Sequence, residues 1–177
     1  MNVYLDTATE DFVLVLFDKD FNVVDFVLLE GYKKKVQLIT EQFQLLLSKN
    51  NLTVGKINNF YINKGPGFFT GVRSSLVYFR TFALLYKKPL FTINTFEILE
   101  TLSPNRENFY IDAQGSKVYF YDKNAIQIVD KDSTEVDKVD YKKMIDSFKD
   151  FKDKFKEENT MDVEPLYIKQ PQIGGVN

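Results

Sequence analysis

The residues whose types and spacing could do chemistry are concentrated in one loop, residues 65–73, which read Gly-Pro-Gly-Phe-Phe-Thr-Gly-Val-Arg. The glycines allow sharp turns, and Thr70 is well placed to cap a helix that begins at Gly71. The free N–H groups at the start of such a helix could hold an anion, most often a phosphate. The alternative is a strand-to-helix connector without a ligand, and the spacing alone leaves both open. The loop residues concerned are Gly65, Pro66, Gly67, Thr70 and Gly71.

Four further residues could take part in chemistry. Asp6 could position a magnesium ion through water, although an aspartate that ends a strand and caps a turn explains it as well. Ser74 and Ser75 follow the loop, but the chain has no histidine to activate them, so we interpret them as small residues that permit close helix packing. Arg73 is a cation near a helix start, where the macrodipole does not favour it. It could pair with a partner carboxylate or with an acidic residue of its own chain.

The composition excludes several classes of site and of protein. Without cysteine there is no disulfide, thiolate metal site or cysteine nucleophile, and without histidine there is no Ser-His-Asp catalysis and no histidine-bound zinc or iron. The 23 basic and 25 acidic residues give a net charge of -2, which disfavours a direct nucleic-acid binder. No run approaches the roughly 18 apolar residues of a membrane span, and no secretion signal is evident. We therefore expect a soluble, cytoplasmic protein.

The elements that must position these residues follow from hydrophobic patterns in residues 1–103. Short strand-like runs with short connections suggest antiparallel pairing, and a change to a helical period marks amphipathic helices. The order is three antiparallel strands, helix, strand, helix and strand, which is the plan of one ribonuclease-H-like lobe with a mixed sheet in the α/β class. The predicted strands are residues 3–6, 12–17, 23–29, 57–62 and 90–93, and the predicted helices are residues 33–50 and 70–87.

The predicted helix at residues 70–87 carries apolar side chains almost all the way round. Such a helix is buried on more than one side. One side can lie on its own sheet, and the other requires further chain or a partner.

Residues 104–177 are predicted to form a second, reduced lobe. It begins with strand-like runs at residues 109–112, 117–121 and 125–129. Residues 130–159 are densely charged, yet their apolar residues keep helical spacing, which predicts a surface helix. A last short strand at residues 166–168 and a loose tail around Gly174 and Gly175 complete the prediction.

Several motifs together resemble one known family. Residues 65–73 closely resemble the Gly-Pro-Gly-Ser-Phe-Thr-Gly-Leu-Arg signature of the TsaB (YeaZ) family. Residues 5–10 are similar to that family's first strand and turn, and residues 89–99 to its segment after the long helix. The Ile-Asp-Ala-Gln run at residues 111–114, with Val118 and Tyr119, resembles its Ile-Asp-Ala-Arg and Val-Tyr motif. Residues 165–169, Pro-Leu-Tyr-Ile-Lys, resemble its closing Pro-x-Tyr-Leu-Arg.

The resemblance implies an actin-like (ASKHA) first lobe and a function in tRNA modification. It implies a noncatalytic subunit that pairs with a TsaD-like transferase, and with a TsaE-like ATPase, to threonylcarbamoylate adenosine 37 of tRNA (t6A synthesis). No cofactor is then expected on this chain alone. ATP, magnesium and a metal ion are expected on the partner subunits, tRNA is bound through the complex, and no membrane is involved.

The resemblance also implies a partner-binding surface formed by the two helices of the first lobe. The residues that this assigns to partner binding are Lys34, Lys35, Leu38, Gln42, Leu45, Arg73, Ser74, Val77, Tyr78 and Thr81. The chain departs from the family pattern at Phe68, where serine is usual, at Gln114, where arginine is usual, and at residues 34–36, where His-Ser is customary. The lysines at residues 33–35 are interpreted as a solvated helix start, with contact to tRNA as the alternative.

Two competing hypotheses remain open from the sequence. One is a small actin-like ATPase that acts on its own through Asp6 and the loop at residues 65–71. Against it, the turn after the first strand lacks the glycines that normally allow phosphate to approach the backbone, and the second lobe is short. The other hypothesis is a homodimer that uses the same two helices when the partner is absent.

Overall fold

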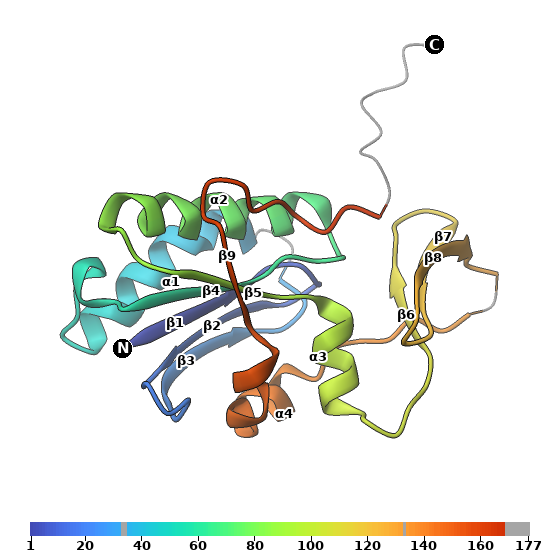
Figure 1. Ribbon diagram of the computed structural model, residues 1–177, viewed down its shortest axis with the longest axis horizontal. Helices are drawn as coiled ribbons and strands as arrows, with labels where there is room; N and C mark the ends of the chain where they lie inside the picture. The colour runs from blue at the N-terminus through green and yellow to red at the C-terminus, as the bar shows by residue number, and fades with distance from the viewer. Residues whose placement is uncertain (33–34, 133, 169–177) are drawn as a thin grey trace, which may run out of the picture.

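A mixed sheet of six strands forms the larger part of the computed structural model (Figure 1), which describes residues 1–32, 35–132 and 134–168. Its strand order is β3-β2-β1-β4-β5-β9. Strands β1, β4 and β5 run parallel, whereas β2, β3 and β9 join antiparallel to their neighbours. The strands are β1 (Asn2–Asp6), β2 (Phe12–Phe17), β3 (Val23–Leu29), β4 (Asn59–Asn63), β5 (Leu90–Ile93) and β9 (Lys156–Glu158).

Helices cover both faces of this sheet, so its central strands are apolar on both sides. Helices α1 (Lys35–Lys49) and α2 (Phe69–Tyr86) lie on one face, above the sheet in Figure 1, and enclose one core with Leu5, Leu14 and Phe60. On the other face, Tyr4 and Phe17 pack against α3 (Thr95–Leu102), α4 (Tyr141–Asp146) and the 3-10 helix η2 (Phe148–Lys154). A further 3-10 turn, η1 (Val54–Lys56), precedes β4.

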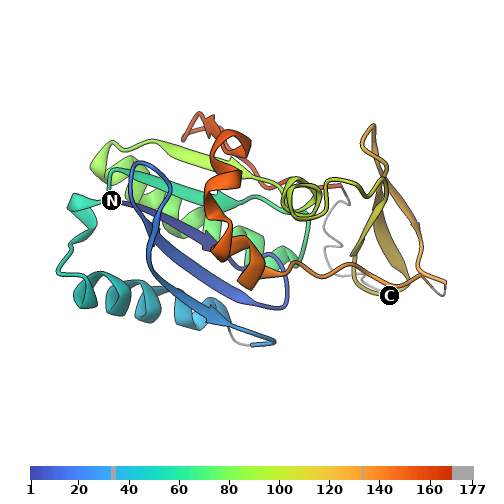
Figure 2. The same ribbon diagram turned by 90° about the horizontal axis from the view of Figure 1, so that it is seen from below.

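A smaller antiparallel sheet of three strands projects from one end of the molecule (Figure 2). Its strands are β6 (Phe109–Asp112), β7 (Lys117–Tyr121) and β8 (Ile126–Asp130). It is joined to the main body through α3, where the rings of Phe96 and Tyr121 are 5.0 Å apart. Among the described helices, none combines the length and the apolarity needed to cross a bilayer.

The predicted fold class is confirmed, and the strands predicted in residues 1–103 are present, with the predicted ends at β2, β3 and β5 and ends shifted by one or two residues at β1 and β4. The charged region differs from the prediction. Its apolar positions do form helical turns, but α4 and η2 bury Tyr141, Phe148 and Phe151 under the large sheet instead of lying on the surface.

The end of the described chain also differs from the prediction. Residues 166–168 do not form the predicted strand. Leu166 N donates to Lys64 O (2.7 Å), but this bond does not belong to a strand ladder. The strand that does form is β9, which pairs with β5 in the large sheet. Residues 104–177 therefore do not all belong to a second lobe, since residues 140–158 return to the first. Gly174 and Gly175 lie outside the described residues.

Candidate functional site

The glycine-rich loop that follows β4 is held by a buried polar network. The Asn63 side chain accepts a hydrogen bond from Gly65 N (2.9 Å), and the Thr95 hydroxyl donates to Pro66 O (2.6 Å). Thr95 N also donates to Gly65 O (3.0 Å), and the Gly65-Pro66 peptide is cis. The loop is thus fixed by the end of β4 and the first residue of α3 before α2 begins.

The next two glycines of the loop let α2 approach the turn after β1. A β-carbon at Gly67 would lie 2.2 Å from Ala8 O, and one at Gly71 would lie 1.9 Å from Thr7 O. Phe68 N donates to Ala8 O (2.6 Å), and the Thr7 hydroxyl donates to Gly71 O (2.7 Å). The glycines therefore accommodate the protein's own backbone, which favours the connector interpretation over a phosphate cradle.

The predicted cap at Thr70 is wrong. The N-cap is Phe68, which makes no side-chain capping bond, and Thr70 lies exposed inside the first turn. The helix starts earlier because Phe68 N is already bonded to Ala8 O, which ends the loop at that residue. Ser75, by contrast, is buried and donates back to carbonyls of its own helix, including Val72 O (3.1 Å), as expected for a packing residue.

Asp6 is completely buried and its carboxylate is surrounded by donors. Its Oδ2 accepts hydrogen bonds from the hydroxyls of Tyr4 and Tyr141, both at 2.7 Å, and from Asn63 Nδ2 at 2.9 Å. Its Oδ1 accepts from Ala8 N (2.8 Å). Burial, and then the Asp6 charge, raise the pKa of both tyrosines well above their ordinary value, so both hydroxyls stay protonated and donate. This arrangement favours the structural role of Asp6.

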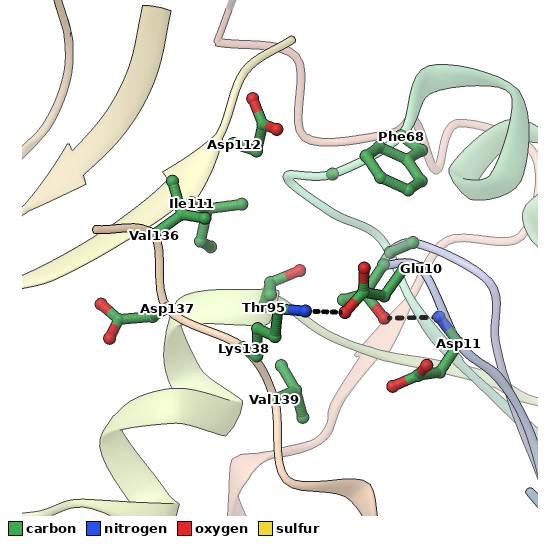
Figure 3. Close-up of a pocket in the computed structure, with 13 residues that line it drawn as sticks. Glu10, Asp11, Phe68, Thr95, Ile111, Asp112, Val136, Asp137, Lys138 and Val139 are labelled. Atoms are coloured by element: carbon green, nitrogen blue, oxygen red, sulfur yellow. Dashed lines mark hydrogen bonds and ion pairs between the residues drawn. The ribbon is translucent and has the colours of Figure 1, made fainter. Parts of the chain in front are cut away.

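A small pocket lies between the turn after β1, the α2 loop and residues 136–139 (Figure 3). Glu10 and Lys138 form an ion pair of 2.6 Å beside it, and Ile111, Val136 and Val139 add apolar walls. Its volume is about 90 Å³. Small-molecule pockets span roughly 300–1,000 Å³, so this one is too small for a nucleotide as it stands.

A larger groove, about 440 Å³ in volume, runs between α1 and α2 on the outer surface. Most of its lining area is contributed by apolar atoms, and Val77 at its centre is 61% exposed. Arg73 stands in the same groove with its guanidinium 5.0 Å from the centre of the Phe69 ring. The groove is lined by Val36, Ile39, Thr40, Arg73, Ser74, Val77, Tyr78, Thr81 and Phe82.

The structure brings together half of the residues predicted for partner binding. Those on α2 all line the groove: Arg73, Ser74, Val77, Tyr78 and Thr81. Those on α1 do not, because Leu38, Gln42 and Leu45 follow the stripe of α1 that faces away from α2. Leu38 is half-buried against the core, and Leu45 is exposed. Lys34 and the side chain of Lys35 lie outside what the structure describes.

The groove residues that were missed on α1 are Val36, Ile39 and Thr40. They share a side of the helix with Phe43, whose ring lies 5.8 Å from Tyr78 and 5.7 Å from Phe82 on α2. That aromatic contact fixes which side of α1 meets α2. Helical spacing from Phe43 back to residues 36, 39 and 40 is the signal that could have identified them.

Within the described ranges, acidic side chains do not gather in threes as a metal site would require. The described residues of the groove offer apolar contact, hydroxyl groups and one guanidinium. Such a surface suits recognition of another protein's helix or strand, with Arg73 as a charged contact at one end.

Comparison with known proteins gives one family and one fold. The family described as "TsaD: tRNA N6-adenosine threonylcarbamoyltransferase" matches residues 32–166. Uncharacterized protein MG208 of Mycoplasma genitalium is 28% identical over 95 residues, which cover 52% of this chain and 48% of that protein. Its homolog in Mycoplasma pneumoniae is 29% identical over 98 residues, which cover 54% and 50%. The match thus spans about half the length of these relatives.

Two solved structures share the fold. YeaZ from Pseudomonas aeruginosa aligns with a TM-score of 0.58 and 20% identity, over 73% of this chain and 65% of that one. A protein described as similar to peptidase YEAZ, from the same organism, aligns with a TM-score of 0.60 and 19% identity, over 77% and 70%. At these identities the likeness concerns the fold.

Proposed function

Because the chain belongs to the TsaD (tRNA N6-adenosine threonylcarbamoyltransferase) family and has the fold of YeaZ, we propose that it is a noncatalytic subunit in threonylcarbamoylation of tRNA adenosine. It pairs with a TsaD-like transferase and supports that partner's activity. The single observation that carries the proposal is the exposed, largely apolar groove between α1 and α2.

The apolar character of this surface continues beyond the groove along α2. Leu84 is 43% exposed, Leu85 is 69% exposed and Tyr86 is 40% exposed, all near the C-terminal end of the helix. Apolar side chains gathered in this way on one helix are typical of a surface that another protein covers. The all-round apolar sequence of α2 is explained if one side faces the sheet and the other faces the partner.

Two features support a role without catalysis. Asp6, the residue on which an independent ATPase would rely for magnesium, has its carboxylate oxygens occupied by the Tyr4, Tyr141 and Asn63 side chains and by Ala8 N. The chain also has no histidine and no cysteine for a zinc or iron site. In the proposal, ATP, magnesium and the metal ion are therefore held by the transferase and by a TsaE-like ATPase in the cytoplasm, and tRNA binds the assembled complex.

The direct test is to mix the purified chain with the TsaD-like protein of the same cell, and to measure association by calorimetry and tRNA modification by mass spectrometry of nucleosides. We expect a stable complex, and modification that depends on this chain. Val77→Asp places a charge at the centre of the groove and should weaken the complex at least tenfold. Val77 is already exposed, so the melting temperature should hardly change.

The matched control is Val24→Asp, the same substitution at a valine that is 47% exposed on the edge strand β3. It should leave association unchanged. If the native proteins neither associate nor show dependence of modification on this chain, the proposal is wrong. A separate titration of the isolated chain with ATP and magnesium tests the hypothesis of an independent ATPase. That hypothesis requires the isolated chain to bind ATP tightly.

A further inference from the structure

The last described segment, residues 159–168, lies along the outer side of α2 and ends near the small sheet (Figure 1). We call this segment the strap. The Arg80 guanidinium, on the C-terminal half of α2, donates to the carbonyls of Met161 and Val163. The Val163 side chain is 4% exposed and belongs to the core beneath α2. The strap is therefore anchored at its start by both a charge-assisted contact and an apolar one.

The other end of the strap is seated on the glycine-rich loop and the first turn of α2. Leu166 N donates to Lys64 O (2.7 Å), and the rings of Tyr167 and Phe69 are 5.5 Å apart. A cavity of only about 40 Å³ remains between residues 165–167 and the loop. Phe69 is thus in contact with the strap on the one hand and, through its ring, with the guanidinium of Arg73 on the other.

This chain of contacts connects the strap to the groove. Arg73 is exposed and lines the groove, and its guanidinium carbon lies 5.0 Å from the centre of the Phe69 ring. An unrestrained arginine samples many rotamers, and holding it in one lowers the entropy lost on binding. Among the described residues that line the groove, the others are apolar or carry hydroxyl groups, and Arg73 supplies the one full charge.

We propose that Tyr167 is a positioning residue: through Phe69 it holds Arg73 ready to receive a carboxylate of the partner at the end of the α1–α2 groove. The inference rests on the proposed function, because it assumes that a partner docks in this groove. It adds a specificity determinant, an acidic side chain on the partner, and assigns a role to the strap, which does not itself line the groove. Arg73 pairs with the carboxylate through its N–H donors, and this contact selects partners that present an acid there.

The first experiment needs no partner. In protein labelled with nitrogen-15, the side-chain Nε–H signal of Arg73 should be displaced by the ring current of Phe69. Tyr167→Ala should move that signal toward the position of a free arginine, and Tyr167→Phe should leave it in place because the ring is kept. An unchanged Arg73 signal in Tyr167→Ala would overturn the inference.

The second experiment is a double-mutant cycle on association with the TsaD-like protein, measured by calorimetry at two salt concentrations. Arg73→Ala should weaken binding about tenfold and reduce its salt dependence. Tyr167→Ala should weaken it about two- to fivefold, and the double variant should be no weaker than Arg73→Ala alone. Additive losses would mean that Tyr167 does not act through Arg73, and would overturn the inference.

Phe26→Ala is the matched control, since Phe26 is 48% exposed on β3 and Tyr167 is 42% exposed. It should leave both the Arg73 signal and association unchanged. If Tyr167→Ala lowers the melting temperature appreciably, Tyr167→Leu, which keeps apolar contact with Phe69, is measured in the same cycle and should bind as the native chain does. A loss equal to that of Tyr167→Ala would mean that the effect does not pass through Phe69, and would overturn the inference. Failure of the native chain to associate at all refutes the proposed function, whereas association without coupling refutes only the role of Tyr167.

Discussion

At Gly67 and Gly71, a single β-carbon would collide with a carbonyl oxygen of the turn after β1. Both clashes involve backbone, which cannot rotate away as a side chain can. The loop that resembled an anion site is therefore a contact between two backbone segments, residues 7–8 and residues 67–71. The glycines in the sequence indicated that something packs closely against this loop. The sequence did not show that the approaching group is the backbone of the turn after β1.

We predict that Gly71→Ala lowers the free energy of unfolding by about 3 kcal/mol, at the upper end of the cost of overpacking. The added methyl group would lie 1.9 Å from Thr7 O and would force α2 away from β1. Denaturant unfolding followed by circular dichroism measures the change.

The control is Gly55→Ala, where the nearest heavy atom is a ring carbon of Tyr86 at an ordinary 3.5 Å. That variant should change stability by less than about 1 kcal/mol. Equal stability of Gly71→Ala and the native chain would contradict the close approach.

Strands and helices with a strong hydrophobic period could be predicted from the sequence. Elements in charged segments, or with an ambiguous period, could not. The runs that became β1, β2 and β3 are apolar and separated by turn residues, so they were found. The sequence of strand β9, Lys-Glu-Glu, has low strand propensity. The strand forms because the preceding α4 and η2 place it beside the edge of β5, with which it pairs.

The sequence predicted a partner-binding surface on α1 and α2, and the structure has a groove between these helices that is lined by the residues assigned on α2 but not by those assigned on α1. Helix α1 has two apolar stripes, one with Leu38 and Leu45 and one with Val36 and Phe43. Periodicity alone does not say which stripe faces α2. The choice is made by the packing of Phe43 against Tyr78 and Phe82, which is a tertiary contact.

The attachment of β9 to the large sheet should depend on pH through Glu158. Its Oε1 accepts hydrogen bonds from Lys64 Nζ (2.6 Å) and from the Thr92 hydroxyl (2.7 Å). Burial alone would raise the pKa of Glu158, but these hydrogen bonds outweigh it and hold that pKa below its ordinary value. Its stabilising contribution is thus present above the unfolded pKa of 4.5 and is lost as the pH falls through the lower, folded pKa.

We predict that Glu158→Gln costs about 1 kcal/mol at neutral pH and flattens the acid limb of the stability curve. Urea unfolding between roughly pH 3 and 7 measures both effects. Glu157→Gln, at the exposed neighbouring position of β9, should reproduce the native curve. If the stability of Glu158→Gln fell with decreasing pH in parallel with that of the native chain, the lowered pKa of the Glu158 carboxylate would be contradicted.

In the molecule as a whole, the large sheet is completed by residues that follow the small sheet in the sequence. Residues 140–158 cover the face that carries Tyr4, Phe17 and Tyr61, and their aromatic rings, such as Phe148 and Phe155, fill that core. A boundary drawn at residue 103 would separate this face from its cover. We therefore expect that residues 1–103 do not fold independently.

We predict that a chain truncated after residue 103 fails to adopt a fixed tertiary structure. Without α4 and η2, the aromatic face is exposed, so the fragment should bind the dye ANS and lose its near-ultraviolet circular dichroism. A chain that ends at residue 168 retains every described element and should behave as the full chain does. A cooperative unfolding transition of the shorter fragment would refute this prediction.

The bond between Tyr141 and Asp6 joins positions that are 135 residues apart. During synthesis, β1 leaves the ribosome long before Tyr141 or β9 is made. Asp6 therefore lacks its Tyr141 bond, and the aromatic face lacks its cover, while most of the chain is synthesised. Contacts of such long range form slowly, because the entropy of closing the loop must be overcome before they contribute stability. The aromatic face therefore stays uncovered until residues 140–158 emerge, and apolar surface exposed in this way favours aggregation of the nascent chain.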